Sequence, residues 1–226
     1  MRQFKYETHA HTAEVSRCAS ISGKDIARFY KAKGYTGLII TDHFFNGNTL
    51  VPSNLSWEER VEWFCSGFEN AYTEGEKIGL HVFFGWEYTY KGTDFLTYGL
   101  DKSWLLDHPD LLSLSLTDYC DLVHRDGGFI IHAHPFRQAD YINMIRLLPH
   151  KVDAVEVINV FNTDFENKQA EEYANNYDLY KIAGSDNHHG RIKKYSGIQF
   201  NKCVKDMYSL VWEIKYGEYS MFTEQE

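Results

Sequence analysis

The chain has 226 residues, of which 43% are hydrophobic and 24% are charged, and its formal net charge is −9. This composition excludes a disordered or fibrous protein and predicts a single domain with a sizeable core. The acidic balance disfavours extended binding to a polyanion such as duplex DNA. No run approaches the roughly 18 consecutive apolar residues of a membrane helix, and the first residues do not resemble a secretory signal. We therefore expect a cytoplasmic protein without a membrane partner.

Short apolar runs alternate along the chain with segments of helical period, which is typical of a parallel sheet covered by helices. The predicted strands are 4–9, 36–41, 80–86, 94–99, 128–133, 153–158 and 180–185. The predicted helices are 23–33, 56–77, 115–126, 137–148, 165–177 and 204–216. This order indicates an α/β barrel or a doubly wound sheet. Because eight barrel units usually need ~250 residues, seven units suit this chain better.

The cysteines are scattered and form no CxxC pair; they are Cys18, Cys65, Cys120 and Cys203. Their spacing indicates neither a disulfide framework nor a thiolate zinc site. We expect buried thiols.

Five of the predicted strands end in residues with metal-ligating side chains. The segments are YETHAH at 6–11, ITDH at 40–43, GWEY at 85–88, IHAHP at 131–135 and GSDNHH at 184–189. Because parallel strands open their carboxyl ends on one side, these side chains are expected to meet in one cleft. Each motif alone has an ordinary structural explanation, but five apolar strands rarely all end in histidines or acids by chance.

A set of His, Asp and Glu ligands without thiolate suits Zn, Mn or Fe, and a carboxylate such as Glu87 is the usual bridge between two ions. Two such ions can polarise a phosphoryl oxygen and lower the pKa of a shared water. Hydrolysis of a phosphoester is the predicted chemistry.

The ordered motifs HxH (His9, His11), TDH (41–43), GxE (85–87), AHP (133–135) and GSDxH (184–188) resemble the PHP family, the polymerase and histidinol phosphatase domain. The resemblance spans residues 4 to about 190. It implies a distorted (β/α)7 TIM-like barrel with two or three divalent ions, and metal-dependent phosphoesterase activity on a small phosphorylated substrate, preferably a phosphomonoester.

Carried onto this sequence, the resemblance implies a ligand role for residues in all five motifs. Ligands of the first metal are His9, His11, Glu87 and Asp186, with Glu87 bridging to a second metal that His134 also binds; His43 and His188 hold a third. Two positions depart from the family pattern. Arg17 stands where the family often has a histidine, so the nearby Glu14 is an alternative ligand. Asp94 replaces a further histidine and is an acceptable oxygen ligand for Mn or Fe.

Supporting roles are predicted for several other side chains. Arg17, Arg137 and Arg191 are candidates for binding the substrate phosphate, because guanidinium groups match phosphate geometry. His132 shares a strand face with His134, so it is a candidate proton donor to the leaving group. Glu156 and Asn159 are placed to orient a ligand histidine, and Phe44, Phe45 and Trp86 to line a substrate pocket.

Two alternatives to a phosphoesterase stay open at this point. One is an amidohydrolase-type barrel hydrolase, which an HxH start also fits, although no lysine ends a predicted strand. The other is a non-catalytic PHP-like module that holds metals for structural reasons or serves a polymerase assembly. Metal-dependent release of phosphate distinguishes the three.

Overall fold

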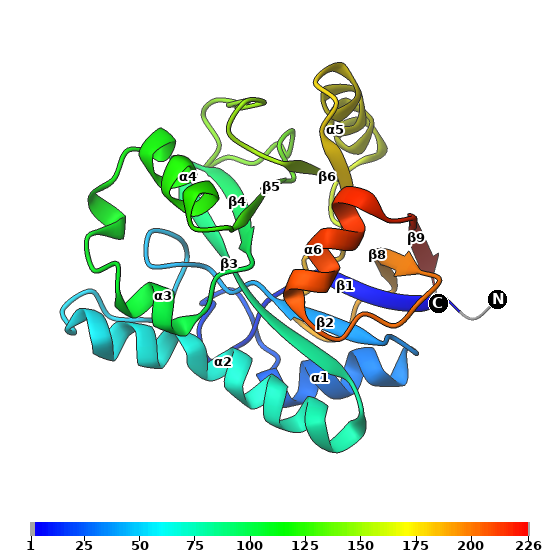
Figure 1. Cartoon of the computed structure of the whole chain (residues 1–226), viewed down its shortest axis with the longest axis horizontal. Coiled ribbons are helices and arrows are strands. Elements are labelled where there is room, and N and C mark those ends of the chain that lie inside the picture. Colours follow the sequence, from blue (N-terminus) through cyan, green and yellow to red (C-terminus); the bar gives the residue numbers. More distant parts are fainter. Residues whose placement is uncertain (1–2, 226) are drawn as a thin grey trace.

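The computed structural model describes residues 3–225, which form a nine-stranded sheet with six α-helices (Figure 1). The strands are β1 (Phe4–Ala10), β2 (Gly37–Ile40), β3 (His81–Tyr90), β4 (Thr93–Tyr98), β5 (Phe129–Ala133), β6 (Ala154–Asn159), β7 (Tyr180–Gly184), β8 (Lys194–Phe200) and β9 (Tyr219–Gln225). The helices are α1 (Gly23–Ala32), α2 (Trp57–Ile78), α3 (Lys102–Leu106), α4 (Leu116–Arg125), α5 (Asp164–Asn176) and α6 (Met207–Tyr216), with a short 3-10 helix at Leu111–Ser113. Within residues 3–225, none of these helices combines the length and apolar composition needed to cross a bilayer.

The sheet curls into a nearly closed barrel. Its strand order is β7-β6-β5-β4-β3-β2-β1-β8-β9. Strands β1, β2 and β3 are parallel, as are β5, β6 and β7. A parallel bridge from Ala10 to Asn187 brings the ends of β1 and β7 together. The predicted barrel-like α/β fold is therefore confirmed, whereas the count of seven β/α units is not confirmed.

The interior of the barrel is filled by alternate residues of the strands, because successive side chains point to opposite faces of a sheet. Tyr6, Leu96 and Ile131 belong to one buried apolar cluster drawn from β1 to β8. Leu210 and Ile214 of α6 join the same cluster, so α6 packs over the interior instead of the outer surface. In Figure 1 this red helix lies beside β1 and β8.

The other helices cover the outside of the barrel. Helices α1 and α2 lie side by side below β2 and β3 in Figure 1, while α3 and α4 cover the β3–β5 side. Helix α2 begins with a capping box between Ser56 and Glu59 and ends at Gly79, whose φ of 68° closes the helix in the left-handed region.

The predicted helix over 137–148 is wrong, because this segment is an irregular loop. Most of its apolar side chains have no core surface to cover: Tyr141 is 64% exposed and Met144 is 59% exposed, and of the rest Leu148 packs against the core. A helix of this length gains its stability mainly from a buried face, which is missing here. The loop is held instead by polar contacts, including Gln138 N to Glu166 Oε1 at 2.6 Å and Arg146 to the Lys91 carbonyl at 2.9 Å.

Strand β4 departs from the expected parallel order. Lys91 and Gly92 both have positive φ, at 50° and 79°, and form a two-residue turn that reverses β3 into β4. Because β4 runs antiparallel to both neighbours, its first residues lie at the same end as the last residues of β3 and β5. This reversal brings Asp94 to the end of the barrel where the motifs cluster. Strands β8 and β9 were not predicted.

Glu7 helps to close the barrel from inside. Its Oε1 accepts backbone hydrogen bonds from His9 N at 3.0 Å and Ser185 N at 2.8 Å, which joins β1 to the segment after β7. Burial raises the pKa of Glu7 to about 7, against the hydrogen bonds from Ser185 and His9.

Because the pKa of Glu7 is higher in the folded state, its stabilising contribution is complete below the unfolded pKa near 4.5 and is lost as the pH rises through about 7. We therefore expect the parent protein to lose stability relative to Glu7→Gln as the pH rises from 5 to 8. The loss should approach about 3 kcal/mol in the free energy of unfolding once Glu7 is fully ionised. Urea unfolding of the metal-free proteins at both pH values measures this difference. The exposed Glu76→Gln is the control, and parallel pH curves for the parent and Glu7→Gln would contradict the assignment.

Candidate metal centre

Seven side chains from the five sequence motifs meet at one end of the barrel. They form three overlapping groups whose ligand atoms lie within 4.8 Å of one another. These groups are His9, His11 and Asp186; His9, Glu87 and His134; and His11, His43 and His188. The convergence follows from the parallel order of the strands, since the carboxyl ends of β1, β2, β3, β5 and β7 open on the same side.

Glu87 is the centre of the cluster and is 1% exposed. Its Oε1 lies 3.2 Å from His134 Nε2 and 3.4 Å from His9 Nε2. Its Oε2 lies 2.7 Å from His43 Nδ1 and 3.6 Å from His11 Nε2. One carboxylate thus faces four imidazoles with both of its oxygens, as a bridging ligand would.

The outer nitrogen of His9 is fixed by a carboxylate. His9 Nδ1 donates to Glu156 Oε1 at 3.0 Å, which leaves Nε2 turned toward Glu87 and Asp186. Glu156 also accepts from His134 N and from Asn159 Nδ2. The predicted contact of Glu156 with a motif histidine is confirmed. Gly184 permits this approach, because a Cβ there would lie only 2.6 Å from Glu156 Oε1.

The outer nitrogen of His11 is fixed through a serine. Ser16 Oγ donates to Asp42 Oδ1 at 2.7 Å, so the same hydroxyl accepts from His11 Nδ1 at 3.0 Å and from His43 N at 3.0 Å. Thr12 donates twice more to Asp42, which holds that carboxylate in place. The Nε2 of His11 is therefore the nitrogen that faces the centre.

These contacts test whether the cluster fits a metal ion. His9 Nε2 and His11 Nε2 are 3.1 Å apart, and both lie within 3.4 Å of Asp186 Oδ1. The Nδ1 of each of these histidines is hydrogen-bonded to Glu156 or Ser16. The two Nε2 atoms and Asp186 Oδ1 therefore face one another with few hydrogen atoms between them. Ligands about 2.1 Å from one ion lie roughly 3.0–3.4 Å apart. A divalent cation fits this arrangement.

Two of the converging side chains sit on left-handed backbone. His134 has a φ of 28° and directly follows β5, which ends at Ala133; Asp186 has a φ of 50° and comes two residues after β7 ends at Gly184. Such conformations cost energy for residues with a Cβ and persist where the surroundings impose them. Here they turn His134 toward Glu87 and Asp186 toward His9 and His11 instead of continuing the strand alternation.

The electrostatics of the cluster favour a cation. Burial disfavours the charged form of Glu87, but His43 and His9 outweigh this effect and hold its pKa well below the usual range. Burial likewise opposes a charge on His9, yet Asp186, Glu156 and Glu87 raise its pKa well above normal. Burial, and then repulsion from His188 and His43, lower the pKa of His11. A positive charge is thus stabilised between the carboxylates, in the place that an ion would take.

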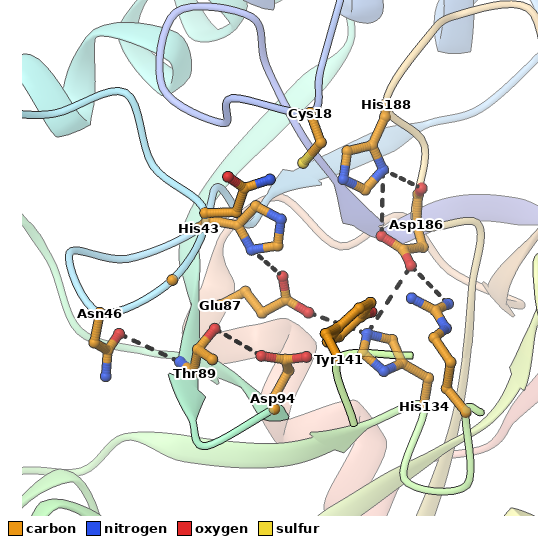
Figure 2. A pocket seen from close by; sticks show the side chains of 14 residues that line it. Cys18, His43, Asn46, Glu87, Thr89, Asp94, His134, Tyr141, Asp186 and His188 are labelled. Atoms are coloured by element: carbon orange, nitrogen blue, oxygen red, sulfur yellow. Dashed lines mark hydrogen bonds and ion pairs between the residues drawn. The ribbon is translucent and has the colours of Figure 1, made fainter. Parts of the chain in front are cut away.

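A cavity of about 530 Å³ opens onto the cluster (Figure 2). Its lining includes Glu87, His134, Asp186 and Asp94, together with the exposed ring of Tyr141. The remaining described residues that line it are Cys18, His43, Asn46, Gly47, Asn48, Thr89, Gly92, Arg137 and His188. The aromatic residues predicted to line it do not: Phe44 and Trp86 are fully buried in the core, with Phe45 packed against them.

Arg137 is the one arginine or lysine among the described residues that line the cavity. Its guanidinium lies 2.8 Å from Asp186 Oδ2 and donates through Nε to Asn162 Oδ1 at 3.0 Å. Burial opposes its charge, but Asp186 outweighs burial and raises the pKa of Arg137. Asp94 lies across the cavity, where its Oδ1 accepts from Thr89 Oγ1 at 2.6 Å. Burial, followed by the charge of Glu87, raises the pKa of Asp94.

Three predicted residues are not brought to the cluster. Both oxygens of Glu14 accept from Gly23 N at 3.0 Å, at the start of α1, so its carboxylate caps a helix. Arg17 is exposed and donates to the Thr49 carbonyl at 3.1 Å. Arg191 is exposed and does not line the cavity.

His132 is also outside the cavity. It lies on β5 facing α5, where its ring stacks on Phe95 at 4.9 Å and meets the edge of Tyr173 at 5.8 Å. The expected common face with His134 fails because β5 ends at Ala133 and the backbone then turns. Burial lowers the pKa of His132 to about 3, so it is neutral in the folded protein near pH 7.

We expect His132→Phe to keep its metal content and hydrolytic rate within about twofold, because the ring packs on Phe95 and Tyr173 and neither ring nitrogen has a hydrogen-bond partner among the described residues. Since the folded pKa is depressed, the parent loses stability as the pH falls below about 6.5, and the variant should lose less. Thermal unfolding at pH 5 and pH 7 measures the second effect. A rate loss of tenfold or more with intact metal content would restore the proton-donor role.

Sequence reasoning missed several residues that contact the centre. Asp42 and Ser16 position His11 through hydrogen bonds. Asp42 could have been recognised from the sequence, because it directly precedes His43 in the TDH motif. Tyr141 was assigned to a helix. Cys18 was expected to be a buried thiol, whereas it is half-buried and faces His43 and His188 (Figure 2). Cys65 and Cys120 are buried as expected, and all four cysteines are unpaired.

No protein-family model and no curated protein sequence matches this chain. Several solved structures do. One is a two-domain protein from Bacteroides vulgatus ATCC 8482 containing a predicted PHP-like metal-dependent phosphoesterase, with TM-score 0.70, 14% identity and coverage of 98% of this chain. This chain spans 65% of that protein.

Two further structures match over nearly their whole length. A candidate metal-dependent phosphoesterase from Bifidobacterium adolescentis ATCC 15703 has TM-score 0.56 and 15% identity, covering 94% of this chain and 96% of its own. An amidohydrolase from Chromobacterium violaceum, solved with sulfate and without metal, has TM-score 0.56 and 12% identity, covering 92% and 96%. These likenesses show the fold: the chain shares the barrel-like architecture of PHP-like metal-dependent phosphoesterases, as its motifs indicated.

Proposed function

We propose that this chain is a metal-dependent phosphoesterase acting on a small phosphorylated substrate, with a preference for phosphomonoesters. The observation that carries the proposal is the convergence of His9 Nε2 and His11 Nε2 on Asp186 and Glu87 beside an open cavity. Both imidazoles have their outer nitrogens fixed by hydrogen bonds, which is typical of histidine ligands.

The proposed ligand set follows from the three groups of converging atoms. His9, His11, Glu87 and Asp186 would hold one ion, and Glu87 with His134 and Asp94 a second. His43 and His188 would contribute to a third. Bound divalent ions such as Zn, Mn or Fe would lower the pKa of a water and polarise a phosphoryl oxygen.

Arg137 is the proposed phosphate-binding residue. Its guanidinium is held by Asn162 and Asp186, so little side-chain entropy is lost when a substrate arrives. It supplies fixed positive charge to a cavity whose other charged groups are mainly carboxylates. Protonation of the leaving oxygen falls to water, since His132 is buried outside the cavity.

The preference for a small monoester rests on size and charge. A cavity of about 530 Å³ accommodates a compact phosphorylated molecule, and the described lining offers a single guanidinium instead of a basic groove. The net charge of −9 also disfavours a long polyanionic substrate. Tyr141, 64% exposed at the cavity, offers an aromatic surface to the organic part of the substrate.

The test is hydrolysis of an aryl phosphate monoester, an aryl phosphodiester and an anilide by the same metal-loaded preparation. We expect release from the monoester to exceed the other two, to stop on chelation and to return with added Mn²⁺ or Zn²⁺. A rate of hydrolysis that does not change when the chelator is added would refute metal dependence.

Faster cleavage of the anilide would instead support an amidohydrolase, whose fold is also represented among the structural matches. Tight metal binding with no hydrolysis of any substrate would support a non-catalytic metal-binding module. The cavity beside the cluster favours the enzyme over that module.

A further inference from the structure

Cys18, which belongs to none of the histidine motifs, lies beside the third group of converging atoms and lines the same cavity. His11, His43 and His188 lie with one ligand atom each within 4.8 Å of one another. The side chains of Cys18, His43 and His188 line one cavity. In Figure 2 its sulfur points into the space between those two rings.

The backbone on both sides of Cys18 is tied to the segments that carry these histidines. Ser20 N donates to the His188 carbonyl at 2.8 Å, and Arg17 N donates to the Asn48 carbonyl at 2.9 Å, in the loop after His43. The position of the sulfur is therefore set by both neighbouring segments at once. The neighbouring Arg17 does not take this position, because its guanidinium donates to the Thr49 carbonyl.

The imidazole of His188 is oriented as a ligand would be. Its Nδ1 donates to the Asp186 carbonyl at 2.7 Å, which leaves the lone pair of Nε2 available on the other side of the ring. The ring stacks on His11 with centroids 4.1 Å apart. Two imidazoles and a thiol that face one shared space match the donor types of a zinc site.

We infer that Cys18 is a ligand of the third metal subsite, together with His43 and His188. The inference rests on the proposed metal centre and adds a thiolate to it. A thiolate is a soft donor, so this subsite should favour Zn²⁺ over Mn²⁺, while the subsites around Glu87, with carboxylate and imidazole donors, suit either ion. The chain would thus hold a mixed set of metals when both are offered.

The experiment replaces the bound metals with Co²⁺ and records near-ultraviolet absorption, where a cobalt–thiolate bond gives a charge-transfer band. We expect the band in the parent protein and in Cys203→Ser, and its loss in Cys18→Ser. Cys203 is a suitable control because it is also half-buried and lies near a single histidine, with Sγ 3.6 Å from His81 Nε2. The dissociation constant of the most weakly bound ion should rise by about 10- to 100-fold in Cys18→Ser.

Two further measurements keep the inference testable if Cys18→Ser does not fold. X-ray absorption on the zinc-loaded parent should show one sulfur at about 2.3 Å from a fraction of the zinc. Cys18→His should keep the full metal content while losing the sulfur signal. Bound cobalt or zinc without sulfur in the parent would overturn the role of Cys18 and leave the rest of the centre intact. Failure to bind any metal would overturn the proposed function as well.

Discussion

Glu87→Gln is expected to abolish most of the metal binding and to lower the hydrolytic rate by about 10³-fold or more. Both oxygens of Glu87 face imidazoles, at 2.7 Å from His43 Nδ1 and 3.2 Å from His134 Nε2. The substitution preserves the shape of the side chain but removes the charge that would join two ions. Elemental analysis of the dialysed protein and phosphate release measure the two effects.

Glu213→Gln is the matched control for Glu87→Gln, because Glu213 is also buried but lies on α6, where it pairs with Lys202 at 2.7 Å. It should keep full metal content. A Glu87→Gln protein that retains its metals and its activity would contradict the bridging assignment.

Arg137→Met is expected to lower kcat/KM for a phosphomonoester by about 100-fold, mostly through a higher KM, which corresponds to about 2.7 kcal/mol. The guanidinium lies in the cavity and is held by Asn162, so its loss removes a preorganised partner for phosphate. Steady-state kinetics with matched metal content measure the change.

The controls for Arg137→Met are Arg17→Met and Arg191→Met. Both side chains are exposed and neither lines the cavity, so both variants should stay within about twofold of the parent. If either control variant lost more activity than Arg137→Met, the assignment of phosphate binding to Arg137 would be wrong.

The sequence predicted the cluster well because its members follow parallel strands. His9, Glu87 and Asp186 are far apart in the chain, but each lies within a few residues of the carboxyl end of an apolar strand. The topology of a parallel α/β sheet brings such ends together regardless of sequence separation. Seven of the nine predicted ligands were thereby placed within three overlapping groups, and Asp94 lines the same cavity.

The errors came from local backbone conformation, which strand periodicity does not encode. His132 was expected to share a face with His134, but the left-handed turn at His134 breaks the alternation. Glu14 was expected to ligate a metal in place of the histidine that Arg17 replaces, yet it caps α1. The Lys91–Gly92 turn was the available signal for the β3–β4 hairpin, and two-residue turns of this kind reverse a strand.

The loop after His134 could not be predicted from its pattern. Its apolar residues recur at helical spacing, but the fold offers no surface to bury them, and Tyr141 is left exposed at the cavity. Cys18 was missed for a related reason. A single cysteine without a paired cysteine carries no metal signal in sequence, and only the path of the backbone between Asn48 and His188 reveals its partners.

If these imidazoles and carboxylates surround cations, the cations should be visible by anomalous diffraction from metal-soaked crystals at the absorption edge. We expect at least two peaks, one bounded by His9, His11, Glu87 and Asp186 and another between Glu87 and His134. An absence of peaks, or peaks confined to the protein surface, would contradict the proposed metal centre.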